Sequence, residues 1–385
     1  MIWKTLSSAP HRLYFLAGAF QGVFAISWWL YDLIASRTGL LPEPDWSVAS
    51  IWAHAFLMIY GFLPFFIFGF LMTAAPNWVN GKKVGRAHYL PAFLFMTAGI
   101  ASFYPALLIG RGALAASIVL YLAGWLASAL ALLHIVVAST SRDKVHAYIV
   151  IGNVFIGCMG VLAYLFWLLT DKPGWLHGSV TIGVWLFLLP IFLSVSHRMI
   201  PFFSSAVLPD YEPRRPYWPL FALLGGMALH AALELAGRFR YLWFADFPMA
   251  VIAFHLSWLW GLRRSFAVRL LAMLHIAFAW LGAALMLYAV QSLVQFASQR
   301  TVLGLAPLHA LTIGYFSSMA LAMVTRVTLG HSGRALKADR ASWFLFLGFQ
   351  SAALFRILGD FPSAGASGFY LAAAMVWLAC FTAWD

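Results

Sequence analysis

The feature that most constrains the fold is a long succession of apolar segments. Each has close to the ~20 residues that a helix needs to cross a bilayer, and about twelve can be drawn. They run over residues 13–35, 49–74, 90–109, 113–138, 146–169, 176–200, 216–236, 242–262, 266–291, 302–325, 341–359 and 365–383. The pattern predicts an all-α polytopic bundle of about 12 transmembrane helices. We expect it to form a single integral membrane domain over residues 1–385.

The composition excludes a soluble protein. Hydrophobic residues make up 63% of the chain and charged residues only 9%, whereas soluble domains carry about 25% charged residues. The net charge of +12 comes from Lys and Arg in the short loops, where basic residues set membrane topology. Nucleic-acid binding is therefore not indicated. The excess of basic residues in alternate loops predicts that both termini lie in the cytoplasm.

Histidines inside the apolar segments are the main candidates for a functional site. An imidazole within a membrane is costly unless it has a partner, so it marks a functional site by default. His54, His275 and His309 lie on three different predicted spans and are the leading haem or metal ligands, with His331 and His255 next. Neutral imidazole binds both haem iron and copper. A structural hydrogen bond is the alternative for each histidine taken alone, and the sequence does not pair them.

Two other residue types could complete such a site. Met58 follows His54 by four residues, on the same face of a helix, and a thioether suits copper. Packing is the alternative role for this methionine. Arg198 and Arg326 lie at the predicted inner ends of their spans. A guanidinium binds carboxylates with two parallel hydrogen bonds, so haem propionates are one candidate partner and anchoring at the membrane surface is the alternative. No CxxCH motif occurs, so any haem is a non-covalent haem b.

His230 and Glu234 are also four residues apart, near the predicted outer end of a span. The carboxylate could orient the imidazole or pass protons to the outer side of the membrane. A simple ion pair at the end of the helix with Arg238 is the alternative.

Several short blocks, taken together and in order, resemble the NnrS family. They are residues 9–12 (APHR), 52–54 (WAH) with 58–62 (MIYGF), 73–78 (TAAPNW), 198–203 (RMIPFF), 274–275 (LH) with 280–281 (WL), 309–314 (HALTIG) and 325–334 (TRVTLGHSGR). The resemblance runs the length of the chain. One block departs from the family pattern, because Phe56 and Leu57 stand where the family has a second histidine and a glutamate. That departure weakens the expectation of a copper site.

The resemblance implies a haem-containing protein of the bacterial inner membrane, with copper as a second metal candidate. It also implies a role in nitric oxide metabolism or defence against nitrosative stress. The protein would lie among membrane lipids, bind a small gas such as nitric oxide and, in the case of turnover, act as a haem-dependent oxidoreductase. A quinol is the candidate electron donor.

Two other functions stay open on the sequence alone. A multi-span transporter would have a polar cavity lined by Asn153, Gln291, Gln350 and arginines, although the chain lacks the two-half pseudo-symmetry that many transporters show. A sensor or assembly protein would bind haem without turnover.

Overall fold

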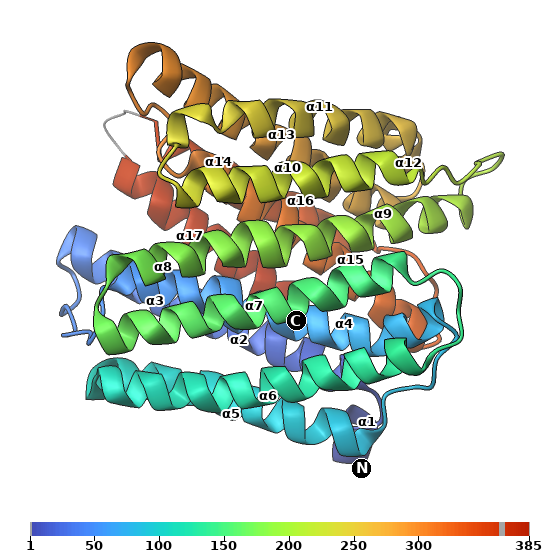
Figure 1. The fold of residues 1–385 in the computed structure, drawn as a ribbon, viewed down its shortest axis with the longest axis horizontal. Helices are drawn as coiled ribbons and strands as arrows, with labels where there is room; N and C mark the ends of the chain where they lie inside the picture. Colours follow the sequence, from blue (N-terminus) through green and yellow to red (C-terminus); the bar gives the residue numbers. More distant parts are fainter. Residues whose placement is uncertain (1, 362–365, 385) are drawn as a thin grey trace. The chain divides into compact units, whose positions relative to one another are not determined.

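The computed structural model describes residues 2–361 and 366–384, whose path is drawn in Figure 1. Within these residues the regular structure is helical and contains no strand. Eleven of the described helices are long and apolar enough to cross a membrane. The predicted all-α polytopic bundle is therefore confirmed.

The chain divides into two compact units, Met1–Ile191 and Phe192–Asp385. The first unit contains α1 (Ile2–Leu6), α2 (Pro10–Thr38), α3 (Ser50–Phe56), η1 (Leu57–Phe62), α4 (Leu63–Trp78), α5 (Arg86–Ile109), α6 (Arg111–Ala138), α7 (Val145–Thr170), α8 (Pro173–Thr181) and η2 (Ile182–Leu188). The boundary falls within α9 (Leu189–Ser205). The single domain and the cytoplasmic termini stay predictions.

The second unit continues from α9 through the rest of the chain. Its elements are α10 (Tyr217–Leu235), η3 (Phe239–Tyr241), α11 (Trp243–Leu259), α12 (Leu262–Ser265), α13 (Arg269–Ser298), α14 (Ala306–His309), η4 (Ala310–Ser317), α15 (Ser318–His331), α16 (Arg340–Leu358) and α17 (Ala366–Trp384). Helices α11 and α13 pack along each other, as do α16 and α17.

The predicted span over residues 242–262 is shorter than expected. It corresponds to α11, an apolar helix of 17 residues. The short 3₁₀ turn η3 precedes it, and Gly261 follows its last residues with a φ of +84°. This left-handed conformation suits glycine and ends the helix.

Three spans contain a π-helical segment, namely η1, η2 and η4. Pro64 and Pro190 follow η1 and η2 closely. A proline has no N–H to donate to the preceding turn, and the wider π turn accommodates that loss. His54 lies just before η1, and His309 lies directly before η4. Such segments occur often at functional sites.

Tyr60 on η1 fixes the packing of the first unit. Its hydroxyl donates a 2.7 Å hydrogen bond to the carbonyl of Ser179. A Cβ added to Gly160 or Gly183 would collide with this same hydroxyl. Glycine is required at both positions because the tyrosine passes between two helix backbones there.

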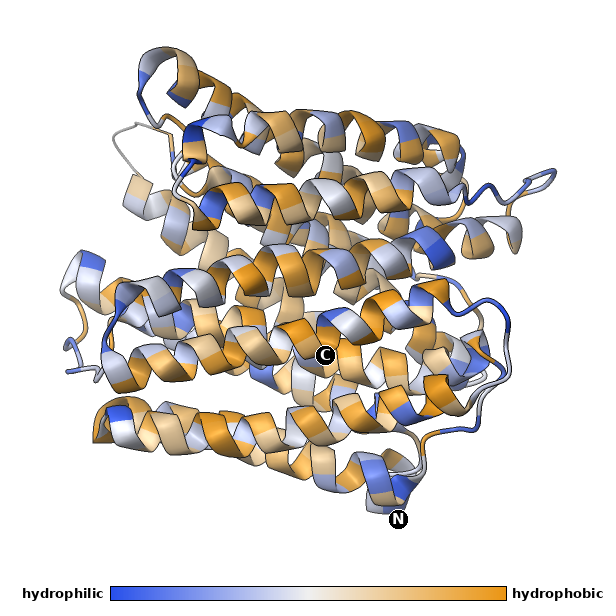
Figure 2. Ribbon diagram, viewed as in Figure 1, coloured by the Kyte–Doolittle hydropathy of each residue, from blue (hydrophilic) through white to orange (hydrophobic). Residues whose placement is uncertain are grey.

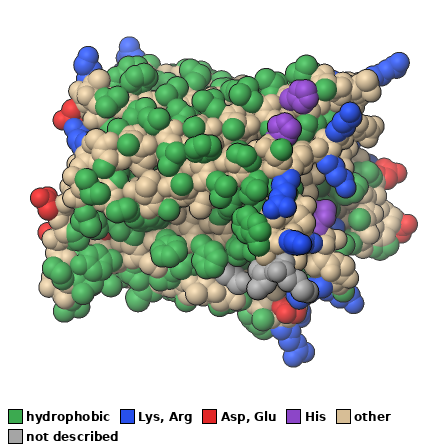
Figure 3. Space-filling model, turned by 90° about the horizontal axis from the view of Figure 1, so that it is seen from below, with side chains coloured by type: hydrophobic (Ala, Val, Ile, Leu, Met, Phe, Trp, Pro, Cys, Tyr) green, Lys and Arg blue, Asp and Glu red, His purple; other side chains and the backbone are tan. Residues whose placement is uncertain are grey.

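The helix surfaces suit a lipid environment. Figure 2 shows hydrophobic residues along the middle of the helices and hydrophilic ones mainly at helix ends and in loops. On the face in Figure 3, hydrophobic side chains cover most of the middle. Phe20 and Phe24 on α2 are 57% and 62% exposed, and Leu108 on α5 is 63% exposed. A soluble protein rarely exposes so much contiguous apolar surface, so these faces contact lipid.

Candidate functional site

The last turn of α9 connects two of the predicted site residues, His275 and Arg326. Ser204 shares a 3.1 Å hydrogen bond with Nε2 of His275 on α13. Its neighbour Phe203 lies under the guanidinium of Arg326 on α15, 3.9 Å from the ring centroid. Consecutive residues of one helix therefore hold a buried imidazole and a buried guanidinium. We call these four residues the α9-end site.

His275 is enclosed by apolar side chains. Its residue is 2% exposed, and Leu271, Leu274 and Phe278 on the same helix are at most 1% exposed. The Ser204 hydroxyl fixes the orientation of the ring, because a hydroxyl can donate to or accept from an imidazole nitrogen. A held imidazole in a dry environment is what an axial haem ligand requires.

Arg326 is 6% exposed. It has no carboxylate or hydrogen-bonding partner among the residues that the structure describes, where its contact is the Phe203 ring. A guanidinium inside a membrane span normally pairs with a negative group, because leaving it unpaired is costly. The unpaired charge therefore points to an anionic or carbonyl-bearing ligand at this end of α9.

These residues fit part of what a haem needs. The α9-end site contains one imidazole and one guanidinium, the groups that would hold a haem iron and a propionate. Arg198 is half-buried five residues before Phe203, a spacing that does not place the two on one helix face. Its predicted role with a propionate stays a prediction.

His275 and His309 lie at different heights of the second unit. A Cβ on Gly314 would be 2.6 Å from the Trp280 ring, so these two residues face each other across α13 and η4. His275 precedes Trp280 by five residues, and His309 precedes Gly314 by five residues. Because the two helices run antiparallel, the histidines lie on opposite sides of the Trp280–Gly314 contact. At 1.5 Å per residue the two are offset by ~15 Å along the axis. Two imidazoles on opposite faces of one iron would lie much closer.

The other predicted ligands in the second unit lie apart from the α9-end site. His309 is half-buried, and Nδ1 lies 3.0 Å from the carbonyl of Leu305 one turn earlier. His255 is exposed on α11, and its ring lies 6.0 Å from that of Trp258. His331 is exposed at the end of α15. Their roles as ligands stay predictions.

His54 belongs to the first unit. Its ring stacks on Trp29 of α2 with a centroid distance of 4.2 Å and an interplanar angle of 18°. Met58 is half-buried on η1, four residues on. No group of three or more His, Cys, Asp or Glu side chains in residues 2–361 and 366–384 is placed to hold a metal ion. The copper role of His54 with Met58 stays a prediction, and we derive no step through copper.

A buried cluster near the end of α10 contains a residue that the sequence interpretation missed. Oδ1 of Asp246 on α11 lies 2.6 Å from Nδ1 of His230, and Oε2 of Glu234 lies 3.4 Å from Nε2. Of the two partners that the sequence left open for Glu234, the structure places His230 within 3.4 Å. Asp246 is the third member, and its only sequence signal is that it is a lone carboxylate within a predicted span.

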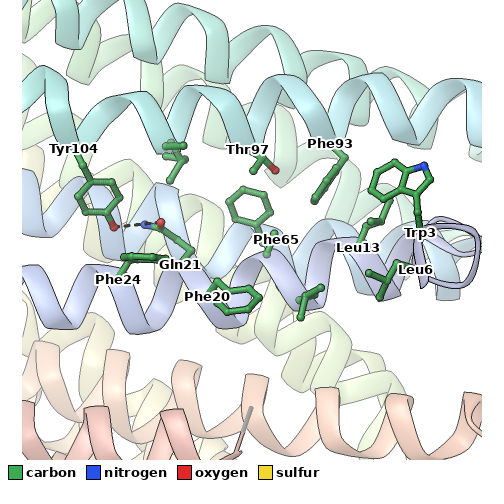
Figure 4. A pocket seen from close by; sticks show the side chains of 14 residues that line it. Trp3, Leu6, Leu13, Phe20, Gln21, Phe24, Phe65, Phe93, Thr97 and Tyr104 are labelled. Atoms are coloured by element: carbon green, nitrogen blue, oxygen red, sulfur yellow. Dashed lines mark hydrogen bonds between the residues drawn. The ribbon is translucent and has the colours of Figure 1, made fainter. Parts of the chain in front are cut away.

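The first unit contains an apolar groove of 530 Å³ between α2, α4 and α5 (Figure 4). Aromatic side chains, among them Phe20 and Phe93, form much of its wall. Tyr104 donates a 3.2 Å hydrogen bond to Oε1 of Gln21 at one end. Nε2 of Gln21 and the Thr97 hydroxyl are buried and have no hydrogen-bond partner among the described residues. The groove thus combines an apolar wall with an amide and a hydroxyl.

Comparison with known proteins gives one family. The model of the NnrS family, described as NnrS protein, matches residues 5–384. No curated protein matches the chain.

Proposed function

Because the chain belongs to the NnrS family, we propose that it is a b-type haem protein of the bacterial inner membrane that acts in nitric oxide metabolism or nitrosative stress defence. The family and the eleven spans make it a polytopic membrane protein linked to nitric oxide. Haem, the reaction and the bacterial inner membrane are the parts that we propose.

The observation that supports haem most strongly is the unpaired charge of Arg326. Arg326 is only 6% exposed near the end of an apolar span, and its guanidinium lies against Phe203, next to the serine that holds the His275 imidazole. A haem carries both complementary groups, an iron for the imidazole and carboxylates for the guanidinium.

In this proposal each residue of the α9-end site has a separate task. His275 would hold the iron through Nδ1, because its Nε2 is engaged by the Ser204 hydroxyl, which fixes the orientation of the ring. Arg326 binds a propionate, and Phe203 supports the flat guanidinium from below. The surrounding leucines and Phe278 exclude water. When bound, haem supplies an iron that can bind nitric oxide and exchange one electron.

We propose a quinol as electron donor, with the groove of Figure 4 as its binding site. Gln21 lies near the middle of the 29-residue helix α2, far from the depth at which lipid headgroups lie. An acyl chain offers no acceptor for an amide at that depth, whereas a quinone ring does.

We expect Gln21→Leu and Thr97→Val to lower the rate of haem reduction by a short-chain quinol. Ser102→Ala, which removes a hydroxyl bonded to Gly99 on the same helix, should leave the rate unchanged. Equal rates in all four proteins would contradict the quinol site.

The hydrogen bonds of two amide side chains make the transporter the weaker hypothesis. Oε1 of Gln350, expected to line its cavity, accepts a 2.9 Å hydrogen bond from Trp280, and its Nε2 donates to Ser318 at 3.1 Å. The Asn153 amide donates to the carbonyl of Ile149 in its own helix. Gln350 joins α16 to α13 and α15, whereas Asn153 bonds within its own helix, so neither amide needs a lined cavity. The haem-binding sensor differs from an enzyme only in turnover.

The first experiment measures the haem itself. The chain is purified in lipid nanodiscs after expression with adequate haem supply, and iron, copper and the reduced-minus-oxidised visible spectrum are recorded before and after nitric oxide is added. We expect stoichiometric iron and a b-type spectrum that shifts with nitric oxide. A colourless protein without stoichiometric iron would overturn the proposal. If nitric oxide shifts the spectrum but is not consumed in the presence of a quinol, the protein is a sensor and not an enzyme.

A further inference from the structure

We propose that His230, Glu234 and Asp246 form a proton-binding relay, which we call the carboxylate–histidine cluster. It takes up a proton at the partly exposed carboxylate of Glu234 and transfers it to the buried carboxylate of Asp246. The cluster lies in the second unit at the predicted outer end of α10. The proposal does not depend on haem or on nitric oxide.

The three side chains lie in a line from the surface to the interior. The side chain of Glu234 is 20% exposed, that of His230 is 1% exposed and that of Asp246 is completely buried. The imidazole lies between the carboxylates, with Nε2 3.4 Å from one and Nδ1 2.6 Å from the other. Ionisable groups inside a span are rare and commonly belong to proton pathways.

The proton count follows from the two contacts. A neutral imidazole has one N–H, so it can donate to only one of the two carboxylates. The other contact is favourable only when that carboxyl is protonated or the imidazole carries a second proton. The cluster therefore holds at least one labile proton beyond that of a neutral imidazole. Without it, a buried carboxylate would lie against the lone pair of a ring nitrogen.

The positions of the neighbouring cations favour a proton shared within the cluster over a fixed ion pair between Asp246 and a lysine or arginine. Arg238 and Arg240 lie in the segment that follows Glu234, at the exposed end of the cluster. Helix α13 contributes Tyr288, whose ring meets the His230 ring edge-on at a centroid distance of 5.4 Å. The remaining cations on elements packed against α11, namely Arg263, Arg264 and Arg269, lie at its other end. No described cation is paired with the carboxylate of Asp246.

The inner end of the line has an acceptor available. Oδ2 of Asp246 is buried and has no hydrogen-bond partner among the described residues, although Oδ1 contacts His230. A metal ion is not the occupant that we infer, because the described side chains are not arranged as metal ligands. A proton on either oxygen neutralises the carboxyl group, so a proton delivered to Oδ1 removes the negative charge from Oδ2 as well.

The relay step moves one proton along the line and conserves charge. It begins with Glu234 protonated, His230 neutral with its proton on Nδ1, and Asp246 ionised. The Glu234 proton moves from Oε2 to Nε2 while the Nδ1 proton moves to Oδ1 of Asp246. It ends with Glu234 ionised, His230 protonated on Nε2 and Asp246 protonated, so the net charge stays −1. The 3.4 Å gap to Glu234 must shorten first, which its partly exposed side chain allows.

Infrared difference spectroscopy of the full chain in nanodiscs tests the relay. Carboxylic-acid C=O bands are recorded as the pH is stepped, and then after H₂O is replaced by D₂O. We expect a titrating band that Asp246→Asn removes. In Glu234→Gln the band should remain, but its shift in D₂O should be at least tenfold slower, because the entry to the relay is blocked.

Matched controls separate a relay from a structural cluster. Glu212→Gln changes a carboxylate of an exposed ion pair in the same unit and should alter neither the buried band nor its exchange. A band that is absent at every pH, or that exchanges equally fast in wild type and Glu234→Gln, would overturn the proposal. Circular dichroism and the unfolding midpoint of Glu234→Gln show that the comparison is made on folded protein.

Discussion

The α9-end site and the carboxylate–histidine cluster, both in the second unit, differ in how their charged side chains are paired. At the α9-end site, Arg326 is a cation without a described anion. In the carboxylate–histidine cluster, two carboxylates already share a histidine. An unpaired buried charge indicates that a ligand completes the site, whereas a group that pairs internally needs only protons. The difference separates a ligand site from a proton site within one bundle.

The largest effect is expected from breaking the internally paired cluster. Asp246→Ala leaves His230 and Glu234 without their buried partner, and we expect a loss of about 3 kcal/mol in the free energy of unfolding. Denaturant unfolding in mixed micelles measures it. Glu212→Ala, which removes an ion pair with side chains 65% and 86% exposed, should change the free energy by less than about 1 kcal/mol. Equal effects of the two variants would contradict the paired cluster.

A second substitution tests the offset between His275 and His309. Gly314→Ala places a Cβ 2.6 Å from the Trp280 ring, and we expect a destabilisation of about 1–3 kcal/mol from overpacking. Gly368→Ala, where nothing lies within 4 Å of the added atom, is the control in thermal unfolding. The haem spectrum of Gly314→Ala should match wild type. A changed axial-ligand spectrum would mean that the position of η4 matters to the iron.

Removing the charge of Arg326 should raise the stability of the haem-free protein, whereas removing Asp246 from the cluster should lower the stability. We expect Arg326→Met to stabilise the haem-free protein by about 1 kcal/mol, because it removes an uncompensated buried charge. The same substitution should weaken haem retention about tenfold, which corresponds to 1.4 kcal/mol. Thermal unfolding of the haem-free protein and haem transfer to an acceptor protein measure the two effects, with Arg334→Met at an exposed position as control. Lower stability without a change in haem retention would assign Arg326 a purely structural role.

The smallest effect concerns a charge outside the membrane. Asp339 caps α16, where its carboxylate accepts a 2.7 Å hydrogen bond from the amide of Ser342. This hydrogen bonding lowers the pKa of Asp339 below its usual value. The cap therefore contributes fully above the ordinary aspartate pKa and is lost as the pH falls through the lowered one. We expect faster amide exchange at the start of α16 in acid and in Asp339→Ala, but not in Asp339→Asn near neutral pH. A pH-independent rate in wild type would contradict the charged cap.

Hydropathy alone was enough to predict the fold, because each apolar segment must satisfy its own backbone hydrogen bonds and therefore becomes a helix. The length of α11 was overestimated, since Gly261 ends the helix within the predicted span at 242–262. The π-helical character of η1, η2 and η4 could not be read from the sequence. A proline follows η1 and η2 within two residues, but none follows η4 in α15.

The sequence was enough to predict which ionisable residues belong to the candidate site, but not which residues they contact. The sequence identified His275 and Arg326 as candidates because both are polar within apolar spans. It could not show that Ser204 and Phe203 connect them, since neither residue is unusual in a helix. Asp246 was missed for the same reason, because its partner His230 lies on another helix and only packing brings the two together.

The central claim is that His275 binds haem iron, and a cavity variant tests it most directly. His275→Gly is purified beside His134→Gly, an exposed histidine outside the predicted ligands, and the visible spectra are recorded with and without added imidazole. We predict that only His275→Gly loses the b-type spectrum and that free imidazole restores it. A spectrum that is unchanged in His275→Gly would contradict the claim and place the iron elsewhere.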